Sequence, residues 1–244
     1  MTLTLPDTAT ALPETAADTR HGLRLALFDL DHTLLPLDSD YAWGQFTVAL
    51  GWRDAESHTR ANDAFYEQYK AGTLDIAEYI RFATSALRDH GLVKANEAHA
   101  RFMNEVIRPA IKPAAQALVQ QHQAAGDTVI IITATNEFVT RPIARAFGVP
   151  ELMAVDLERD ARGEPTGEIR GTPSFREGKV ALVEQWLVAR GLSWADVTHS
   201  SFYSDSINDL PLLEKVHEPV ATNPDARLQA IAAERGWRVL NLFE

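Results

Sequence analysis

Two aspartates one residue apart, Asp29 and Asp31, end an apolar run in the segment FDLDHTLL, and Thr33 follows them. Two carboxylates about 4 Å apart repel each other by roughly 4 kcal/mol at an effective dielectric constant of about 20. A divalent cation held by oxygen ligands would offset this repulsion. The pattern therefore predicts a metal-assisted carboxylate site at the end of a strand.

Three further segments carry polar residues at the end of an apolar run or at the start of a helix. These residues are Thr133 in IIITATN, Lys179 in REGKVALV, and Asp205, Asn208 and Asp209 in YSDSINDL. In a parallel sheet the strand ends would meet at one edge, where ligands bind. We expect a nucleophilic carboxylate, a second carboxylate, a hydroxyl, an ammonium and a metal ligand to gather there.

This set of groups favours phosphoryl transfer. The uncatalysed hydrolysis of a phosphate monoester is among the slowest known reactions, so the site must stabilise its transition state strongly. A metal and a lysine would neutralise charge on the transferring oxygens. One aspartate can accept the phosphoryl group as an acyl phosphate, and a second can protonate the leaving alkoxide and later deprotonate water.

Strand-like and helix-like segments alternate along much of the chain. Apolar, β-branched runs predict strands at 23–30, 128–135, 151–158, 199–205, 219–222 and 237–242. Helical patterns followed by glycine cover 112–125, 137–147 and 178–190. The alternation predicts an α/β protein with a doubly wound, Rossmann-like, mainly parallel sheet and helices on both faces.

A long helix-like stretch interrupts this alternation after the first strand. It predicts a helical cap inserted into the α/β core, while turn residues in DARGEPTGEIRG (160–171) predict a hairpin or flap. The predicted division of the chain is a flexible N-terminal leader, a core in two pieces and the cap: residues 1–21, residues 22–37 with 109–244, and residues 38–108.

Taken in order, the four polar segments resemble the four motifs of the haloacid dehalogenase superfamily, in particular its phosphoserine phosphatase-like subfamily IB. The resemblance covers residues 23 to about 225. It implies that Asp29 is the nucleophile and that Asp31 is the general acid/base, which also binds Mg²⁺ through its main-chain carbonyl. It further implies that Asp29 and Asp205 complete the metal shell with Asp31. Because dehalogenases of the family lack the second aspartate, Asp31 favours a phosphatase.

The resemblance also implies roles for the remaining polar residues. Thr133 and Lys179 would hold the phosphate, while Asn208 and Asp209 would support the metal and contact the phosphate. The other residues predicted to bind substrate are Thr33, Asp38, Thr135 and Asn136.

Departures from the phosphoserine phosphatase pattern leave the substrate open. His32 and Asp38 stand where those enzymes have Ser and Glu, although Asp38 is still able to bind an ammonium group. The second motif is Thr133-Ala134-Thr135-Asn136 in place of Ser-Gly-Gly. Phosphoserine, histidinol phosphate and other small phosphomonoesters all remain candidates. An aromatic cap would be able to stack on a ring, with candidates Tyr41, Trp43, Phe46, Trp52, Phe65, Tyr66 and Tyr69.

The net charge and the cysteine content of the chain limit which classes of partner and which cellular compartment we expect. The net charge of −11 disfavours nucleic acids and anionic membranes as partners. The chain has no cysteine, which excludes thiolate catalysis and suits a reducing compartment, and we predict a cytoplasmic location. The function predicted is a Mg²⁺-dependent phosphatase of small phosphomonoesters that works through an aspartyl-phosphate. The alternatives are a non-hydrolytic phosphate-ligand-binding protein or a phosphotransferase on the same scaffold, and the oligomeric state stays open.

Overall fold

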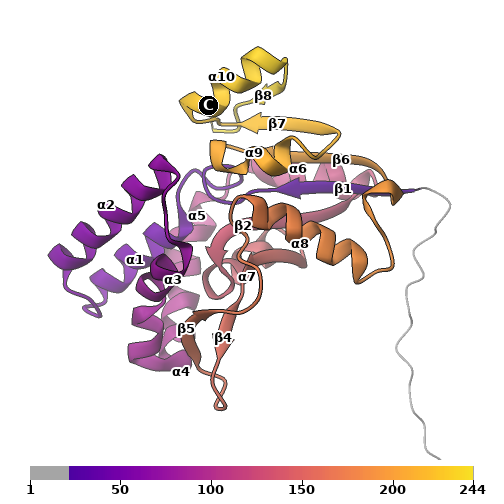
Figure 1. Cartoon of the computed structure of the whole chain (residues 1–244). Helices are drawn as coiled ribbons and strands as arrows, with labels where there is room; N and C mark the ends of the chain where they lie inside the picture. Colours follow the sequence, from indigo (N-terminus) through magenta and orange to yellow (C-terminus); the bar gives the residue numbers. More distant parts are fainter. Residues whose placement is uncertain (1–21, 244) are drawn as a thin grey trace, which may run out of the picture.

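The central layer of the protein is a parallel sheet, which a computed structural model describes together with the rest of residues 22–243 (Figure 1). The leader predicted for residues 1–21 lies outside the described residues. Within the described range the sheet has six strands in the order β3-β2-β1-β6-β7-β8. Their bounds are β1 Leu23–Phe28, β2 Thr128–Asn136, β3 Glu151–Val155, β6 Val197–Ser204, β7 Glu218–Thr222 and β8 Arg238–Leu240. The predicted doubly wound parallel sheet is confirmed.

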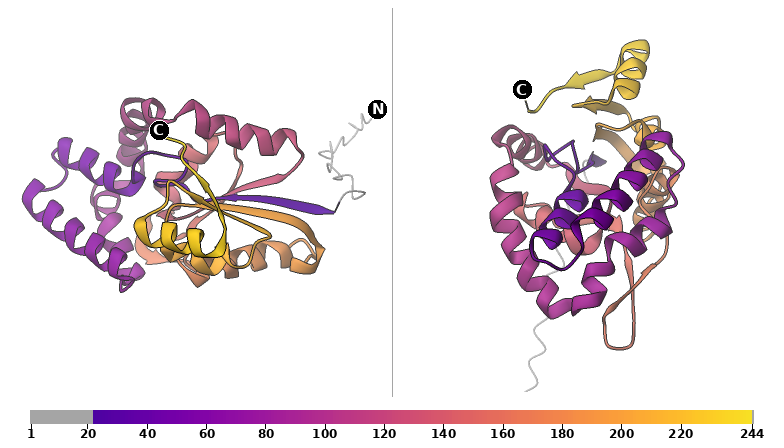
Figure 2. Two further views of the ribbon diagram at one scale, coloured as in Figure 1. Left: turned by 90° about the horizontal axis from the view of Figure 1, so that it is seen from above. Right: turned by 90° about the vertical axis from the view of Figure 1, so that its left-hand side faces the viewer.

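Helices cover both faces of this sheet (Figure 2). Successive side chains of a strand point to opposite faces. In β1, Ala26 and Phe28 therefore pack with α6 and α7, while Leu25 and Leu27 pack with α8, α9 and α10. These helices are α6 Pro113–Ala124, α7 Glu137–Ala146, α8 Glu177–Val188, α9 Leu210–Leu213 and α10 Ala226–Arg235. Two short 3₁₀ turns flank β6, η2 Trp194–Asp196 and η3 Ile207–Asp209.

A lobe of helices lies between β1 and α6 in the chain and projects from one end of the sheet (Figure 1). It comprises α1 Ser39–Ala49, α2 Ala55–Ala71, α3 Ile76–Ala83, α4 Ser85–Phe102, the π-helical turn η1 Met103–Ile107 and α5 Arg108–Ala110. Asp38, Asp54 and Asp75 cap the first three helices by accepting main-chain N–H groups. Gly72 ends α2 and Gly91 breaks α4, both with positive φ, which glycine adopts without strain.

A hairpin reaches from the core to this lobe. It pairs β4 Leu157–Arg159 with β5 Pro165–Ile169 in antiparallel fashion, as the turn residues predicted. Leu157 packs with Ile80 and Leu87 of the lobe, and Arg81 forms an ion pair with Glu168 at 2.8 Å.

The single strand predicted for 151–158 is wrong at Asp156, where β3 ends before β4 begins. The main-chain carbonyl of Asp156 accepts from the Arg170 N–H, and its carboxylate pairs with the Arg170 guanidinium. These contacts turn the chain out of the sheet and into the hairpin.

No helix among residues 22–243 is long and apolar enough to cross a bilayer. The cytoplasmic location stays a prediction.

Candidate active site

Three neighbouring strands end at the same edge of the sheet and bring the predicted residues together. Asp29 directly follows β1, and Asp205 directly follows β6. Thr133 lies within β2, near its carboxyl end. β1 pairs with β2 on one side and with β6 on the other, all in parallel, so their carboxyl ends are adjacent. The strand order thus accounts for the convergence of segments that are about a hundred residues apart.

Lys179 lies between two carboxylates at the centre of the site. Its Nζ donates to Asp29 Oδ1 at 2.8 Å and to Asp209 Oδ2 at 2.7 Å, and all three side chains are buried. Ser204 Oγ also donates to Asp209 Oδ2, at 2.7 Å. Burial opposes the charge on Lys179, but Asp209 and Asp29 outweigh it and raise the pKa of the ammonium. The lysine is therefore held charged beside Asp29.

Thr33 joins the first and last segments. Its Oγ1 lies 3.4 Å from Asp29 Oδ2 and 3.2 Å from Asp205 Oδ1, and it accepts from the Asp205 N–H at 3.0 Å. A hydroxyl has one proton to donate, so it satisfies one of these two carboxylates at a time.

Asp31 points away from this cluster. Its Oδ1 accepts from the Ser39 N–H and its Oδ2 accepts from Thr135 Oγ1, both at 2.8 Å. Burial, followed by the charge of Asp38, raises the pKa of Asp31 to about 6. The carboxyl group is thus fixed at both oxygens and borders the cavity described below.

The donor set at the strand ends fits a divalent cation. Three carboxylates, those of Asp29, Asp205 and Asp209, surround the single ammonium of Lys179, so negative charge is left over in a buried place. Burial and then the charges of Asp29 and Asp209 raise the pKa of Asp205 well above its ordinary value. Carboxylate oxygens are the ligands that Mg²⁺ prefers, usually one or two of them together with waters and substrate phosphates.

No three His, Cys, Asp or Glu side chains of residues 22–243 form a complete metal site by themselves. The Mg²⁺ ligands predicted from the sequence are of another kind. They combine the side-chain carboxylates of Asp29 and Asp205 with a main-chain oxygen, the carbonyl of Asp31. Water or phosphate oxygens would have to complete the coordination shell.

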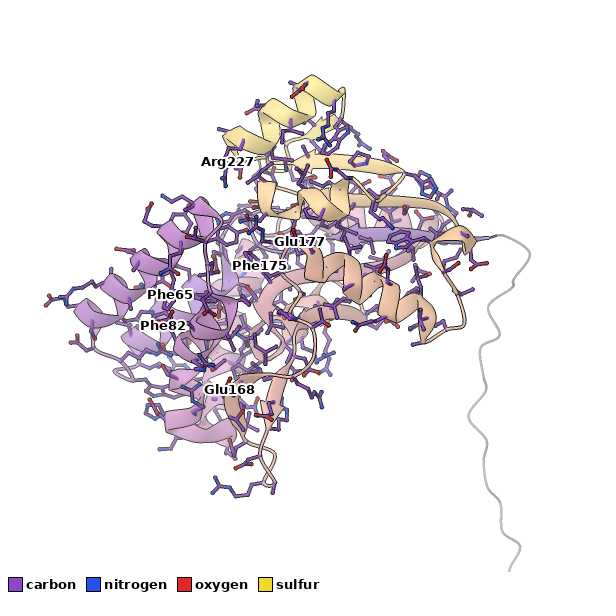
Figure 3. All side chains as sticks on the ribbon, viewed as in Figure 1. Phe65, Phe82, Glu168, Phe175, Glu177 and Arg227 are labelled. Carbon is purple, nitrogen blue, oxygen red and sulfur yellow. The ribbon has the colours of Figure 1, made fainter. Side chains whose placement is uncertain are left out.

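A cavity of about 870 Å³ lies between this edge of the sheet and the helical lobe. The catalytic candidates form its floor, and Phe175, at the junction between the lobe and α8, contributes from the core side (Figure 3). The predicted aromatic residues separate into two groups. Those that line the cavity are Tyr41, Phe65, Tyr66 and Tyr69. Trp43 and Phe46 pack in the apolar core instead, and Trp52 stacks on His90.

Asp38 and Asn136, two of the predicted substrate-binding residues, cap the N-termini of helices. Asp38 Oδ1 accepts from the main-chain N–H groups of Asp40 and Tyr41 as the N-cap of α1, although the residue still lines the cavity. Asn136 caps α7 through Val139 N–H and donates to Asp40 Oδ1 at 3.3 Å. Asn136 does not line the cavity.

Asn208 and Tyr69 connect the core to the lobe. Asn208 Nδ2 donates to the main-chain carbonyl of Tyr69 at 3.3 Å, and Tyr69 OH donates to Ser206 Oγ at 3.0 Å. Arg176 adds a third contact by donating to the Gly72 carbonyl at 2.9 Å. These contacts hold the end of α2 over the site.

Sequence reasoning missed several of these residues. Ser204 is the last residue of β6 and directly precedes Asp205. As a polar residue at a strand end, it fits the pattern from which the other site residues were predicted. Ser206 and Arg176 carry no comparable signal, because their roles depend on how the lobe docks on the core. Tyr69 was predicted as an aromatic candidate for the cavity, but its hydrogen bond to Ser206 was not predicted.

Comparisons with known proteins agree with this geometry. A sequence profile of the family described as haloacid dehalogenase-like hydrolase matches residues 26–214. A histidinol-phosphatase of Neisseria meningitidis serogroup C (strain 8013) is 45% identical over 217 residues, which cover 89% of this chain and 98% of the relative.

Solved structures also resemble the chain. A protein with unknown function from Bordetella pertussis Tohama I is 50% identical, with a TM-score of 0.85 over 91% of this chain and 100% of that chain. A phosphoserine phosphatase solved as a phospho-aspartyl intermediate analogue superposes with a TM-score of 0.61 at 18% identity, over 91% of this chain and 94% of the other. The second likeness concerns the fold alone.

Proposed function

The chain belongs to the haloacid dehalogenase-like hydrolase family and is a phosphatase of small phosphoesters, and we propose that it works through a phosphoryl group carried on Asp29. The observation that carries this proposal is the position of Asp29. Its carboxylate is buried at a strand end, 2.8 Å from the ammonium of Lys179, and it faces the cavity. A carboxylate held in this way is a nucleophile beside a fixed positive charge.

In the proposed first step a carboxylate oxygen of Asp29 attacks the phosphorus of the substrate. The bond between phosphorus and the alkoxide oxygen breaks, and the alkoxide leaves with its electron pair. Lys179 lies at Asp29 and would stabilise charge on the phosphoryl oxygens. Thr33 is fully buried and does not line the cavity, so it would orient the carboxylates of Asp29 and Asp205. Thr133 and Thr135, which line the same part of the cavity, would orient the phosphate.

Asp31 is the proposed acid and base. It would give its proton to the leaving alkoxide. It would then take a proton from the water that attacks the phosphorus of the aspartyl-phosphate, while the bond between phosphorus and the Asp29 oxygen breaks and releases inorganic phosphate and the free Asp29 carboxylate. The hydrogen bonds from Ser39 and Thr135 fix its carboxyl group in a single orientation for both steps.

We propose that Asp29, Asp205 and the main-chain carbonyl of Asp31 hold Mg²⁺, with Asp209 and Asn208 supporting this part of the site. When bound, the ion would neutralise charge on the phosphoryl oxygens. The surplus of buried carboxylates around Lys179 supports this assignment.

We further propose that residues 38–108 act as a cap and that the substrate is an amino-alcohol phosphate without a carboxylate, such as histidinol phosphate. The name of the Neisseria meningitidis relative supports this choice. Among the described residues that line the cavity from the lobe, the one cation is Lys70, which already pairs with Glu67 at 2.6 Å. Arg227 of α10 lines the cavity from the core. On the side of the lobe, the carboxylates of Asp38 and Asp63 suit an ammonium group better than a carboxylate.

The test is phosphate release from histidinol phosphate, phosphoserine, a sugar phosphate and a nucleotide, with Mg²⁺ and with excess chelator. We expect Mg²⁺-dependent turnover with a preference for histidinol phosphate, and we expect Asp29→Asn to abolish it without loss of the folded state by circular dichroism. Substantial hydrolysis by Asp29→Asn would sink the mechanism. Turnover that survives the chelator would remove Mg²⁺ from it, and preference for phosphoserine would overturn the substrate assignment.

A further inference from the structure

One row of side chains on α2 faces inward at helical spacing: His58, Asn62, Phe65 and Tyr69. Two of the polar members have partners within the protein. His58 contacts the Arg53 guanidinium at 3.2 Å, and Tyr69 donates to Ser206. Asn62 differs from both. It is only 8% exposed and lines the cavity, yet its carboxamide forms no hydrogen bond with any residue from 22 to 243.

The polar atoms of Asn62 are not sealed from solvent, because they open into the cavity. A ligand that displaces water from them must replace the hydrogen bonds of that water or lose affinity. A carboxamide offers one acceptor oxygen and two N–H donors. A bound ligand would satisfy those atoms of Asn62 that open into the cavity.

We propose that Asn62 is a specificity-determining residue that recognises the leaving group of the substrate, with its carboxamide oxygen accepting an N–H of that group. This inference rests on the proposed function, because it assumes that a phosphate ester occupies the cavity. It assigns to the cap a polar contact that the phosphate-binding floor does not provide.

The surroundings of Asn62 favour a leaving group that donates rather than accepts. Asp63 follows it on α2, and Asp38 also lines the cavity, so the lobe presents carboxylates beside Asn62, while its one lining cation, Lys70, pairs with Glu67. Phe65, about one turn further along α2 (Figure 3), lines the cavity and supplies apolar surface. A flat, nitrogen-bearing cationic group such as an imidazole or an aminoalkyl chain fits this combination.

The experiment measures binding in an Asp29→Asn background, where no turnover is needed. The dissociation constants of histidinol phosphate and of phenyl phosphate, whose ring carries no N–H, are determined by calorimetry with and without Asn62→Ala. We expect Asn62→Ala to raise the dissociation constant of histidinol phosphate about tenfold, which corresponds to the loss of about one hydrogen bond. It should leave phenyl phosphate within about twofold of its starting value. Asn62→Asp, which keeps the acceptor, should retain the affinity for histidinol phosphate.

The control is Gln68→Ala, a change of similar size on the same helix at a residue that does not line the cavity. It should change neither constant. Equal weakening of both ligands by Asn62→Ala would show a structural role, and no change in either would also overturn the proposal. Asn62-dependent binding combined with an inert wild-type enzyme would instead contradict the proposed function and leave the recognition role standing.

Discussion

At the scale of residues, the site is organised around Lys179. A buried ion pair adds little net stability, because the desolvation of both charges offsets their attraction. Its value here is geometric. With Asp29 on one side and Asp209 on the other, the ammonium is fixed by two contacts of 2.8 and 2.7 Å, and Ser204 fixes Asp209 in turn. In the mechanism that we propose, the positive charge that would meet the phosphoryl group is therefore in place before the substrate arrives.

The role that we propose for Asp31 as proton donor matters most when the leaving group is a strong base. Asp31→Asn should slow the hydrolysis of an alkyl phosphate such as histidinol phosphate by about 10²–10⁴-fold, because an alkoxide needs the proton. It should slow p-nitrophenyl phosphate far less, since that phenolate leaves without a proton. The measurement is kcat for both substrates. Asp160→Asn, in the hairpin turn, is the control and should change neither rate, and equal losses on both substrates would rule out the role.

At the scale of elements, α4 joins the lobe to the core through a buried histidine. His99 Nε2 lies 3.0 Å from the Val139 carbonyl of α7, and the rings of Trp43, Phe102 and Phe138 surround it. Burial lowers the pKa of His99 to about 4. The unfolded chain therefore binds a proton between about pH 6.5 and pH 4 that the folded protein does not bind.

We expect the contribution of His99 to the free energy of unfolding to fall by roughly 3 kcal/mol as the pH is lowered through this window, because each pKa unit corresponds to about 1.4 kcal/mol. The raised pKa values of buried carboxyl groups such as Asp31 act in the opposite direction. His99→Gln lacks the histidine contribution alone, so its pH dependence should differ from that of the wild type by about this amount, as measured by urea unfolding at several pH values. His90→Gln keeps His99 and should leave the slope in place. A slope that is unchanged in His99→Gln would assign the pH dependence to other groups.

The sequence predicted elements well where local patterns define them. Apolar runs that end in polar residues marked β1 and β2, and glycines marked the ends of α6, α7 and α8. The proximity of Asp29, Thr133 and Asp205 could be predicted, because the carboxyl ends of parallel strands meet at one edge of the sheet. Docking of the lobe could not be predicted, because it rests on contacts such as Tyr69 with Ser206, which are 137 residues apart and have no periodic signal. The inward position of Asn62 was missed for the same reason.

At the scale of the whole molecule, an acidic chain with a net charge of −11 offers an anionic substrate a site whose charge must be balanced locally. Lys179 supplies part of that balance, and we propose that Mg²⁺ supplies the rest. The lobe covers the cavity above these groups, and the contacts of Asn208 and Arg176 hold the end of α2 in place. Small phosphoesters fit such a space, whereas a folded macromolecule would not enter it.

Because Mg²⁺ would bind the folded protein and not the unfolded chain, it should raise the melting temperature. A free Mg²⁺ concentration of about a hundred times the dissociation constant would stabilise the folded protein by about 2.7 kcal/mol. Differential scanning fluorimetry with Mg²⁺ should show this rise in the wild type and a much smaller one in Asp205→Asn, with NaCl at equal ionic strength as the control. An equal rise in both proteins would place the cation elsewhere.

The most direct test of the account is the chemical trapping of the phosphorylated residue. During turnover of histidinol phosphate, borohydride reduces an acyl phosphate to the corresponding alcohol, which converts the reacting aspartate to homoserine, and peptide mass spectrometry then locates it. We predict homoserine at position 29, dependent on substrate and absent without it. Homoserine at another aspartate, or rapid phosphate release with Asp29 unmodified, would contradict the central claim that Asp29 carries the phosphoryl group.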